Sequence, residues 1–167
     1  MNENVIVGQS GGPTAVINSS LAGVFKTAKD RGAKKVYGMI HGIKGLLDKQ
    51  YVDLSDKIKT TMDIDLLKRT PSSFLGSCRF KLPEIEKDKA TFEKIFSILN
   101  ELEIGYFFYI GGNDSMDTIK KLSDYAKLIN SDIKFMGVPK TIDNDLAVTD
   151  HTPGYGSAAK FIAATMK

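Results

Sequence analysis

Residues 104–110, Ile-Gly-Tyr-Phe-Phe-Tyr-Ile, form an almost wholly apolar and aromatic run that ends at Gly111-Gly112. A strand with one face in water alternates apolar and polar side chains, whereas a continuous apolar run is typical of a strand buried on both faces. Strands of that kind occur in parallel sheets that are covered by helices on both sides. This run therefore favours an α/β fold.

The first forty residues have the order of a βαβ unit. The apolar run Val5–Val7 precedes the turn Gly8–Pro13, and apolar residues then recur at helical spacing from Ile17 to Ala28. A second short strand is predicted at Lys35–Met39. Strand, glycine turn, helix and strand in this order favour parallel pairing. We predict a doubly wound α/β domain with a mainly parallel sheet and helices on both faces.

The remaining elements are predicted from the same periodicities. They are a loop or edge strand at Asp48–Ser55, a short helix at Met62–Arg69, a loop at Thr70–Pro83, helices through Phe92–Leu102 and Ile119–Ile129, and a strand at Ile133–Val138 that Pro139 closes. From Ser157 the chain reads as a helix without a stop signal. We expect residues 1–167 to be one domain of a longer protein, and this segment alone to have little activity.

Composition narrows the classes of function. The 167 residues suffice for one domain with a core, and the net charge of +3 comes from basic and acidic residues that are interspersed. This gives no reason to expect nucleic acid or a membrane surface as partner. No apolar run approaches the ~20 residues that span a bilayer, and no signal peptide is evident. The lone Cys78 excludes an internal disulfide. A cytoplasmic protein is expected.

Three turns follow apolar strands and carry the residues best suited to chemistry: Gly8–Pro13, Gly111–Ser115 and Pro139–Asp145. In a doubly wound sheet such turns gather at the carboxyl ends of the strands, where ligands bind. The first two turns are rich in glycine and are expected to open onto helices, whose free N–H groups favour phosphate. Together the three turns predict a phosphate site.

Simpler interpretations exist for each turn. Gly-Gly after a strand is often only a tight turn, Asp114 suits a helix cap, and Asp143 and Asp145 suit a polar turn. No Gly-Lys-Ser/Thr follows these turns, so they are not a P-loop, and the glycine spacing does not fit a dinucleotide-binding oxidoreductase. Two carboxylates placed two residues apart nevertheless suit shared work on a metal and a hydroxyl group. Phosphoryl transfer needs little more than these parts.

Four motifs resemble those of the 6-phosphofructokinase family in order and spacing, across essentially the whole chain. They are Gly-Gly-Pro-Thr-Ala-Val-Ile-Asn at 11–18, Leu-Gly-Ser-Cys-Arg at 75–79, Gly-Gly-Asn-Asp-Ser at 111–115 and Pro-Lys-Thr-Ile-Asp-Asn-Asp at 139–145. The resemblance implies phosphorylation of fructose 6-phosphate with Mg²⁺, in a homo-oligomer.

The resemblance also implies roles for individual residues. Asp143 matches the general base that takes the proton of the sugar 1-hydroxyl, and Asp145 matches its partner near the metal. Thr141 matches a ligand of fructose 6-phosphate or of the moving phosphoryl group, and Lys140 is grouped with these catalytic residues. The residues implied to bind the donor phosphates are Gly11, Gly12, Arg79, Gly112, Asp114, Ser115 and Lys140.

Two positions resemble the branch of the family that uses pyrophosphate. Asp114 lies where ATP-dependent members have glycine, and Lys140 lies where many bacterial ATP-dependent members have another glycine. Asp114 and Asn113 are the implied metal ligands, although Asn113 replaces an aspartate and a neutral amide is a weaker ligand for Mg²⁺. The alternatives are an ATP-dependent 6-phosphofructokinase and a non-catalytic regulatory subunit of the same fold.

Two other features are assigned structural roles. His41 and His151 lie far apart without ligand spacing, so surface or hydrogen-bonding roles are expected for both. The segment Thr149–Ser157 follows the catalytic motif and is expected to support it.

Overall fold

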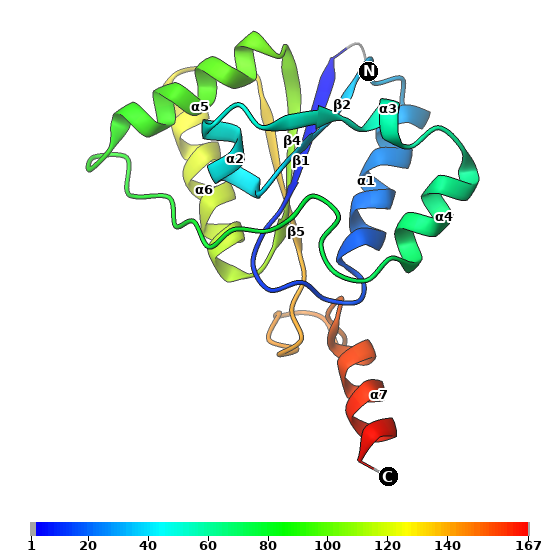
Figure 1. Ribbon diagram of the computed structural model, residues 1–167. Coiled ribbons are helices and arrows are strands. Elements are labelled where there is room, and N and C mark those ends of the chain that lie inside the picture. Colours follow the sequence, from blue (N-terminus) through cyan, green and yellow to red (C-terminus); the bar gives the residue numbers. More distant parts are fainter. Residues whose placement is uncertain (1–2, 167) are drawn as a thin grey trace.

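The computed structural model describes residues 3–166 and shows a five-stranded sheet between two layers of helices (Figure 1). The strands are β1 (Asn4–Gln9), β2 (Val36–Met39), β3 (Tyr51–Asp53), β4 (Ile104–Gly111) and β5 (Lys134–Pro139). The helices are α1 (Ile17–Asp30), α2 (Gly42–Leu47), α3 (Leu54–Lys57), α4 (Thr61–Arg69), α5 (Lys89–Glu101), α6 (Asn113–Leu128) and α7 (Tyr155–Thr165). The predicted doubly wound α/β fold is confirmed.

The strand order, β3-β2-β1-β4-β5, makes β1 and β4 the centre of the sheet. β1 pairs in parallel with both β2 and β4, β4 pairs in parallel with β5, and only the edge strand β3 runs antiparallel. The chain leaves β1 toward β2 on one side, and β4 lies on the other side. The carboxyl ends of β1 and β4 therefore form a topological switch point, where ligands bind in sheets of this kind.

Alternation along the central strands divides the core into two layers. On one face Phe107 and Tyr109 of β4 pack with the buried sides of α2, α5 and α6. On the other face Val5 and Val7 of β1, with Tyr106 of β4, pack against α1, α3 and α4. The run at 104–110 thus has apolar contacts on both faces, as its composition predicts.

Two short helices were not predicted, and glycine explains the omission for α2. Gly42 and Gly45 lower the helix propensity of Gly42–Leu47 by about 1 kcal/mol each relative to alanine. The fold requires both, because Gly42 has φ of +60° and a Cβ on Gly45 would lie 1.6 Å from the carbonyl oxygen of Ile40. The other omission, α3, is a single turn that follows the β3 edge strand.

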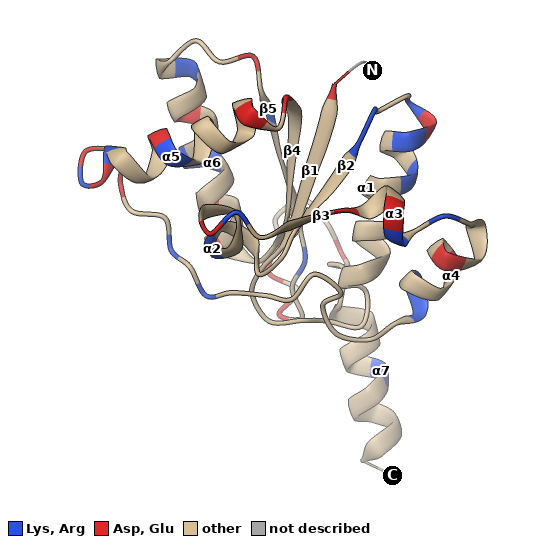
Figure 2. Cartoon of the chain, turned by 45° about the horizontal axis from the view of Figure 1, so that its top comes forward, with Lys and Arg blue, Asp and Glu red and all other residues tan. Residues whose placement is uncertain are grey.

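The last helix, α7, projects away from the sheet, and none of its residues is buried (Figure 1). Figure 2 shows basic and acidic residues interspersed over α1, α4 and α5, in keeping with the sequence pattern. No helix within residues 3–166 combines the length and the apolar character that a membrane span needs.

Candidate active site

The register of the sheet brings the three predicted turns to one level. Gln9 pairs with Ile110, and Gly111 pairs with Pro139, so β1, β4 and β5 end side by side. The turns then begin with backbone hydrogen bonds between neighbours: the N–H of Ser10 donates to Ile110 O at 2.9 Å, and the N–H of Lys140 donates to Gly111 O at 3.0 Å.

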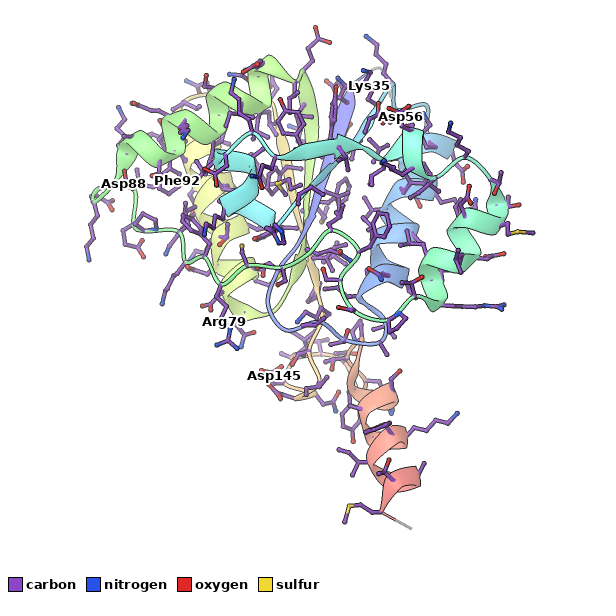
Figure 3. The ribbon with its side chains drawn as sticks, viewed as in Figure 1. Lys35, Asp56, Arg79, Asp88, Phe92 and Asp145 are labelled. Carbon is purple, nitrogen blue, oxygen red and sulfur yellow. The ribbon has the colours of Figure 1, made fainter. Side chains whose placement is uncertain are left out.

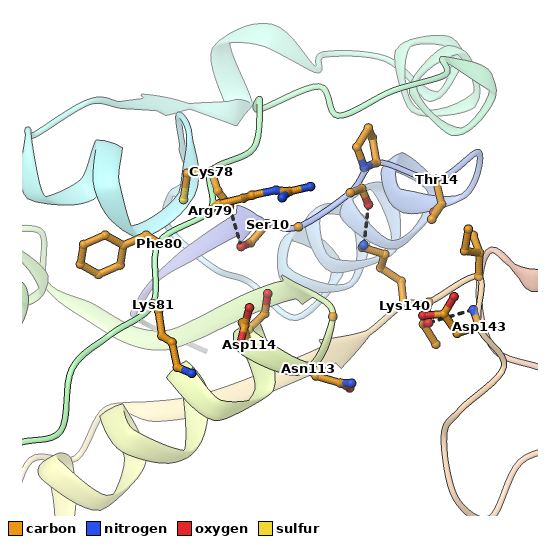
Figure 4. Close-up of a pocket in the computed structure, with 17 residues that line it drawn as sticks. Ser10, Thr14, Cys78, Arg79, Phe80, Lys81, Asn113, Asp114, Lys140 and Asp143 are labelled. Carbon is orange, nitrogen blue, oxygen red and sulfur yellow. Dashed lines mark hydrogen bonds between the residues drawn. The ribbon is translucent and has the colours of Figure 1, made fainter.

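A pocket of about 550 Å³ opens where these turns meet (Figure 4). Its walls come from all three turns and from one further segment at 78–81. The lining residues are Ser10, Gly11, Gly12, Pro13, Thr14, Cys78, Arg79, Phe80, Lys81, Gly112, Asn113, Asp114, Ser115, Lys140, Thr141, Ile142 and Asp143. All the predicted site residues except Asp145 therefore line one cavity.

The first turn, Gly8–Pro13, contributes backbone groups and open volume to the pocket. Gly11 has φ of +76°, which L side chains rarely adopt, and a Cβ there would lie 3.3 Å from the Lys140 ammonium. A Cβ on Gly12 would meet nothing within 4 Å. The helix that follows does not reach the pocket, because α1 begins only at Ile17 and its first residues are not among the lining residues. Helices follow both glycine-rich turns, as predicted, but the start of α1 does not line the pocket.

The second turn does place a helix N-terminus at the pocket. Gly112 is the N-cap of α6, and no side chain makes a capping hydrogen bond there. Asp114 lies in the first turn of α6 with its side chain exposed, so the helix-cap interpretation of this residue is wrong. The free N–H groups at this end carry partial positive charge that favours an anion. The carboxylate of Asp114 lies at this same end of α6, where it adds a negative charge.

Lys140, in the third turn, is 5% exposed, which is unusual for a lysine. Its ammonium donates a hydrogen bond to the carbonyl oxygen of Gly12, and this bond ties the third turn to the first (Figure 4). Burial lowers the pKa of Lys140 below its ordinary value, and the nearby Asp143 carboxylate raises it in part. The site thus holds a partly dehydrated cation beside an exposed carboxylate.

The loop that carries Asp143 is braced by the segment that follows it. Asn144 adopts φ of +55°, and its side chain donates to Asp150 O at 3.0 Å and accepts from the N–H of Thr152 at 3.0 Å. Thr152, which is buried, donates through Oγ1 to Thr141 O at 2.8 Å. The N–H of Asp143 donates to Thr141 Oγ1 at 3.0 Å. Residues 149–153 therefore support the loop, as the sequence predicts.

Asp145 lies outside the pocket and contacts Asn113, whose amide nitrogen donates to Asp145 Oδ2 at 3.5 Å. Figure 3 shows Asp145 at the same end of the sheet as Arg79. Within residues 3–166 no three His, Cys, Asp or Glu side chains group closely enough to hold a metal on their own. The pocket does offer the carboxylates of Asp114 and Asp143. Mg²⁺ in phosphoryl-transfer sites uses one or two carboxylates with substrate phosphates and water, and the Asp114 carboxylate, next in sequence to the Asn113 amide, supplies one such ligand.

The segment at 70–79, which carries Arg79, is held by two buried amides that the sequence reading missed. Gln9 Oε1 accepts from Leu75 N and Ser73 Oγ, both at 2.9 Å, and Gln9 Nε2 donates to Asn18 Oδ1 at 2.9 Å. Asn18 accepts from the N–H of Phe74 at 2.9 Å as well. Both amides are fully buried. A Gln at the end of an apolar strand and an Asn on the buried face of α1 were the signals for this anchor.

Other residues noted in the sequence have structural surroundings. Cys78 is half-buried, and its Sγ lies 4.0 Å from the hydroxyl of Tyr109. His41 is exposed at the start of α2, and a side chain on Gly76 would clash with its ring. The ring of His151 lies 6.1 Å from that of Tyr155. Neither histidine lines the pocket.

Comparison with known proteins connects this geometry to a family. The phosphofructokinase family model matches residues 4–167. A pyrophosphate–fructose 6-phosphate 1-phosphotransferase of Rhodospirillum rubrum is 48% identical over 95% of this chain and 38% of the relative. One of Xanthomonas campestris is 45% identical over 99% of this chain and 39% of the relative.

Solved structures with a similar fold come from the same family. The crystal structure of a pyrophosphate-dependent phosphofructokinase from Marinobacter aquaeolei matches with a TM-score of 0.86 and 42% identity, over 98% of this chain and 40% of that one. The chain thus spans about two fifths of the length of the relatives it matches. By its family match, its relatives and its fold, this chain belongs to the phosphofructokinase family.

Proposed function

We propose that this chain is the N-terminal, donor-binding and catalytic domain of a pyrophosphate-dependent fructose-6-phosphate 1-phosphotransferase. The reaction converts fructose 6-phosphate and pyrophosphate into fructose 1,6-bisphosphate and phosphate. The observation that carries the proposal is that Asp114 and Lys140 line the same pocket. A carboxylate there occupies space that an ATP α-phosphate would need, whereas pyrophosphate has no third phosphate and avoids the repulsion.

Each pocket residue has its own role in the proposed phosphoryl transfer. Asp143 accepts the proton of the sugar 1-hydroxyl as its oxygen attacks one phosphorus atom of pyrophosphate. A new C–O–P ester forms, the P–O–P bridge breaks, and the second phosphoryl group leaves as phosphate. The buried Lys140 and the guanidinium of Arg79 balance the negative charge of the transferring and leaving groups. Thr141 orients the acceptor next to Asp143.

Mg²⁺ is part of the proposal, with Asp114 and Asn113 as the residues that would hold it and Asp145 close to them through its contact with Asn113. Bound there, it would neutralise the charge on the phosphate oxygens. Asn113 would contribute an amide oxygen while its nitrogen keeps the hydrogen bond to Asp145. A cytoplasmic homo-oligomer is expected for the full-length enzyme on the family resemblance alone.

The deciding experiment assays a full-length enzyme that contains this chain with pyrophosphate and ATP as separate donors, measuring formation of fructose 1,6-bisphosphate. We expect pyrophosphate to be preferred by at least ~10-fold in kcat/KM, which corresponds to about 1.4 kcal/mol. A preference for ATP would identify an ATP-dependent enzyme instead. Activity with neither donor would favour the regulatory subunit, although such a subunit has no need for a base at Asp143.

A further inference from the structure

The pocket contains one cation with no role in the reaction as described so far. Its basic lining residues are Arg79, Lys81 and Lys140, and its acidic lining residues are Asp114 and Asp143. Lys140 is engaged with Gly12, and Arg79 is assigned to the donor. Lys81 is the remaining cation, two residues after Arg79 on the same segment.

The backbone of that segment directs Lys81 toward the pocket. Exposure alternates along it: Phe80 packs against the core cluster around Phe107 and Leu82 is fully buried, whereas Arg79 and Lys81 are exposed. An extended chain places successive side chains on opposite sides, so residues 79 and 81 share one side. The partly buried Phe80 and the fully buried Leu82 thereby anchor the segment that carries Arg79 and Lys81 on the pocket wall.

The ammonium of Lys81 has no protein partner within residues 3–166, where the structure records neither a hydrogen bond nor an ion pair for it. The contrast is Lys121, a lysine of the neighbouring helix α6, whose ammonium lies 2.8 Å from both Glu84 and Asp117. Lys121 is neutralised by its neighbours, whereas Lys81 keeps its hydrogen-bonding capacity for a ligand.

The charge balance of the pocket depends on Lys81. Three cations against two carboxylates leave a net charge of +1, and without Lys81 the lining would be neutral. Pyrophosphate is a polyanion. The pocket wall that pyrophosphate must approach also carries the negative charge of Asp114. In Figure 4, Lys81 and Asp114 lie toward one end of the pocket, and Lys140 and Asp143 lie toward the other. Lys81 is therefore at the Asp114 end of the pocket and away from Asp143, the residue proposed to accept the proton.

We propose that Lys81 is a donor-binding residue that contacts the phosphoryl group of pyrophosphate that leaves as phosphate, and that offsets the Asp114 carboxylate there. The inference rests on the proposed function. The flexible stem of a lysine and its compact charge suit contact with a group that must be released after each turnover.

The test compares Lys81→Met, Lys81→Arg and the control Lys87→Met in the full-length enzyme. Lys87 is exposed on the same connecting segment but does not line the pocket. For Lys81→Met we expect KM for pyrophosphate to rise about tenfold, the lower end of the range for hydrogen bonds to charged groups, because the site is open to solvent. KM for fructose 6-phosphate should stay within about twofold of normal in this variant. Lys81→Arg should restore most of the loss, and Lys87→Met should behave as the unaltered enzyme.

The reverse reaction tests whether Lys81 contacts the phosphoryl group that leaves as phosphate. With fructose 1,6-bisphosphate and phosphate as substrates, Lys81→Met should raise KM for phosphate and leave KM for the sugar bisphosphate unchanged. A general disturbance of the fold would affect both substrates in both directions. Normal KM values for pyrophosphate and phosphate in Lys81→Met would overturn this inference while leaving the proposed function intact. An unaltered enzyme that does not use pyrophosphate would overturn both.

Discussion

Two turns of this molecule each present an exposed carboxylate to the same pocket, and they hold it in different ways. Asp114 lies in the first turn of the 16-residue helix α6, whose buried face includes Thr118 and Leu122. Asp143 lies in an irregular loop between β5 and α7, where the bonds of Asn144 and Thr152 fix the backbone. One carboxylate is placed by regular secondary structure, and the other by a few side-chain hydrogen bonds.

The difference matches the work proposed for each turn. A residue that excludes ATP must stay where it is, and a long helix with a packed face gives it a fixed position. A residue that accepts a proton must approach an incoming hydroxyl closely, and a braced loop can bring it outward from the sheet. Loops on rigid scaffolds commonly carry catalytic groups for this reason. Substitutions in the two turns should therefore differ in size and kind.

The largest effect is expected at the end of the braced loop. Asp143→Asn removes the base but keeps the shape of the side chain, so kcat should fall by roughly 10²–10⁴-fold. Affinity for fructose 6-phosphate should change much less, because the amide retains one acceptor oxygen. Steady-state kinetics of the full-length variant measure both quantities.

The matched control for this variant is Asp150→Asn, an exposed aspartate of the same loop that does not line the pocket. It should keep near-normal kcat. If Asp143→Asn retains more than about a tenth of normal kcat, a barrier change below ~1.4 kcal/mol, the base is another residue.

The next effect concerns Asp114 and donor choice. Asp114→Gly opens the α6 end of the pocket and removes a negative charge, so the ratio of kcat/KM for ATP to that for pyrophosphate should rise at least ~10-fold. Adding Lys140→Gly should move the preference further toward ATP, because the ammonium that attracts pyrophosphate is lost. The measurement is kcat/KM for each donor in the single and the double variant.

Asp117→Asn provides the comparison on the same helix, since Asp117 pairs with Lys121 and does not line the pocket. Its donor ratio should equal that of the unaltered enzyme. An unchanged ratio in both Asp114 variants would mean that the carboxylate of α6 does not select the donor.

The two turns also differ in how far their sequence predicts their structure. Glycines after the apolar run 104–110 predict a turn at Gly111, and the structure explains the need, because a Cβ there would lie 2.0 Å from Ser115 Oγ. The start of α6 at Asn113 follows from the same local signals. Such features depend on neighbours in the chain, which a sequence displays directly.

The contacts that bring the Lys140 turn and the segment at 70–79 to the first turn and to β1 are not local in this sense. The contact of Lys140 with Gly12 joins residues 128 positions apart, and the anchor from Gln9 to Leu75 joins residues 66 apart. No periodicity predicts which buried amide will meet which loop. The sequence thus predicts the sheet, the helices and the meeting of three turns, whereas the segment at 78–81 becomes part of the site only through long-range contacts.

The last prediction tests whether the catalytic turn depends on its few side-chain bonds. Asn144 combines φ of +55° with two hydrogen bonds to the 150–152 segment. Asn144→Ala loses both bonds and strains the backbone by about 1–2 kcal/mol, so kcat should fall about fivefold through misplacement of Asp143. Asn144→Gly also loses both bonds but adopts positive φ without strain, so its loss should be smaller. The melting temperature should fall by a few degrees at most, and by more in Asn144→Ala than in Asn144→Gly, because only alanine adds backbone strain to the loss of both bonds. Equal losses in Ala and Gly would assign the effect to the hydrogen bonds alone, and normal kcat in both would show that the loop holds its shape without this brace.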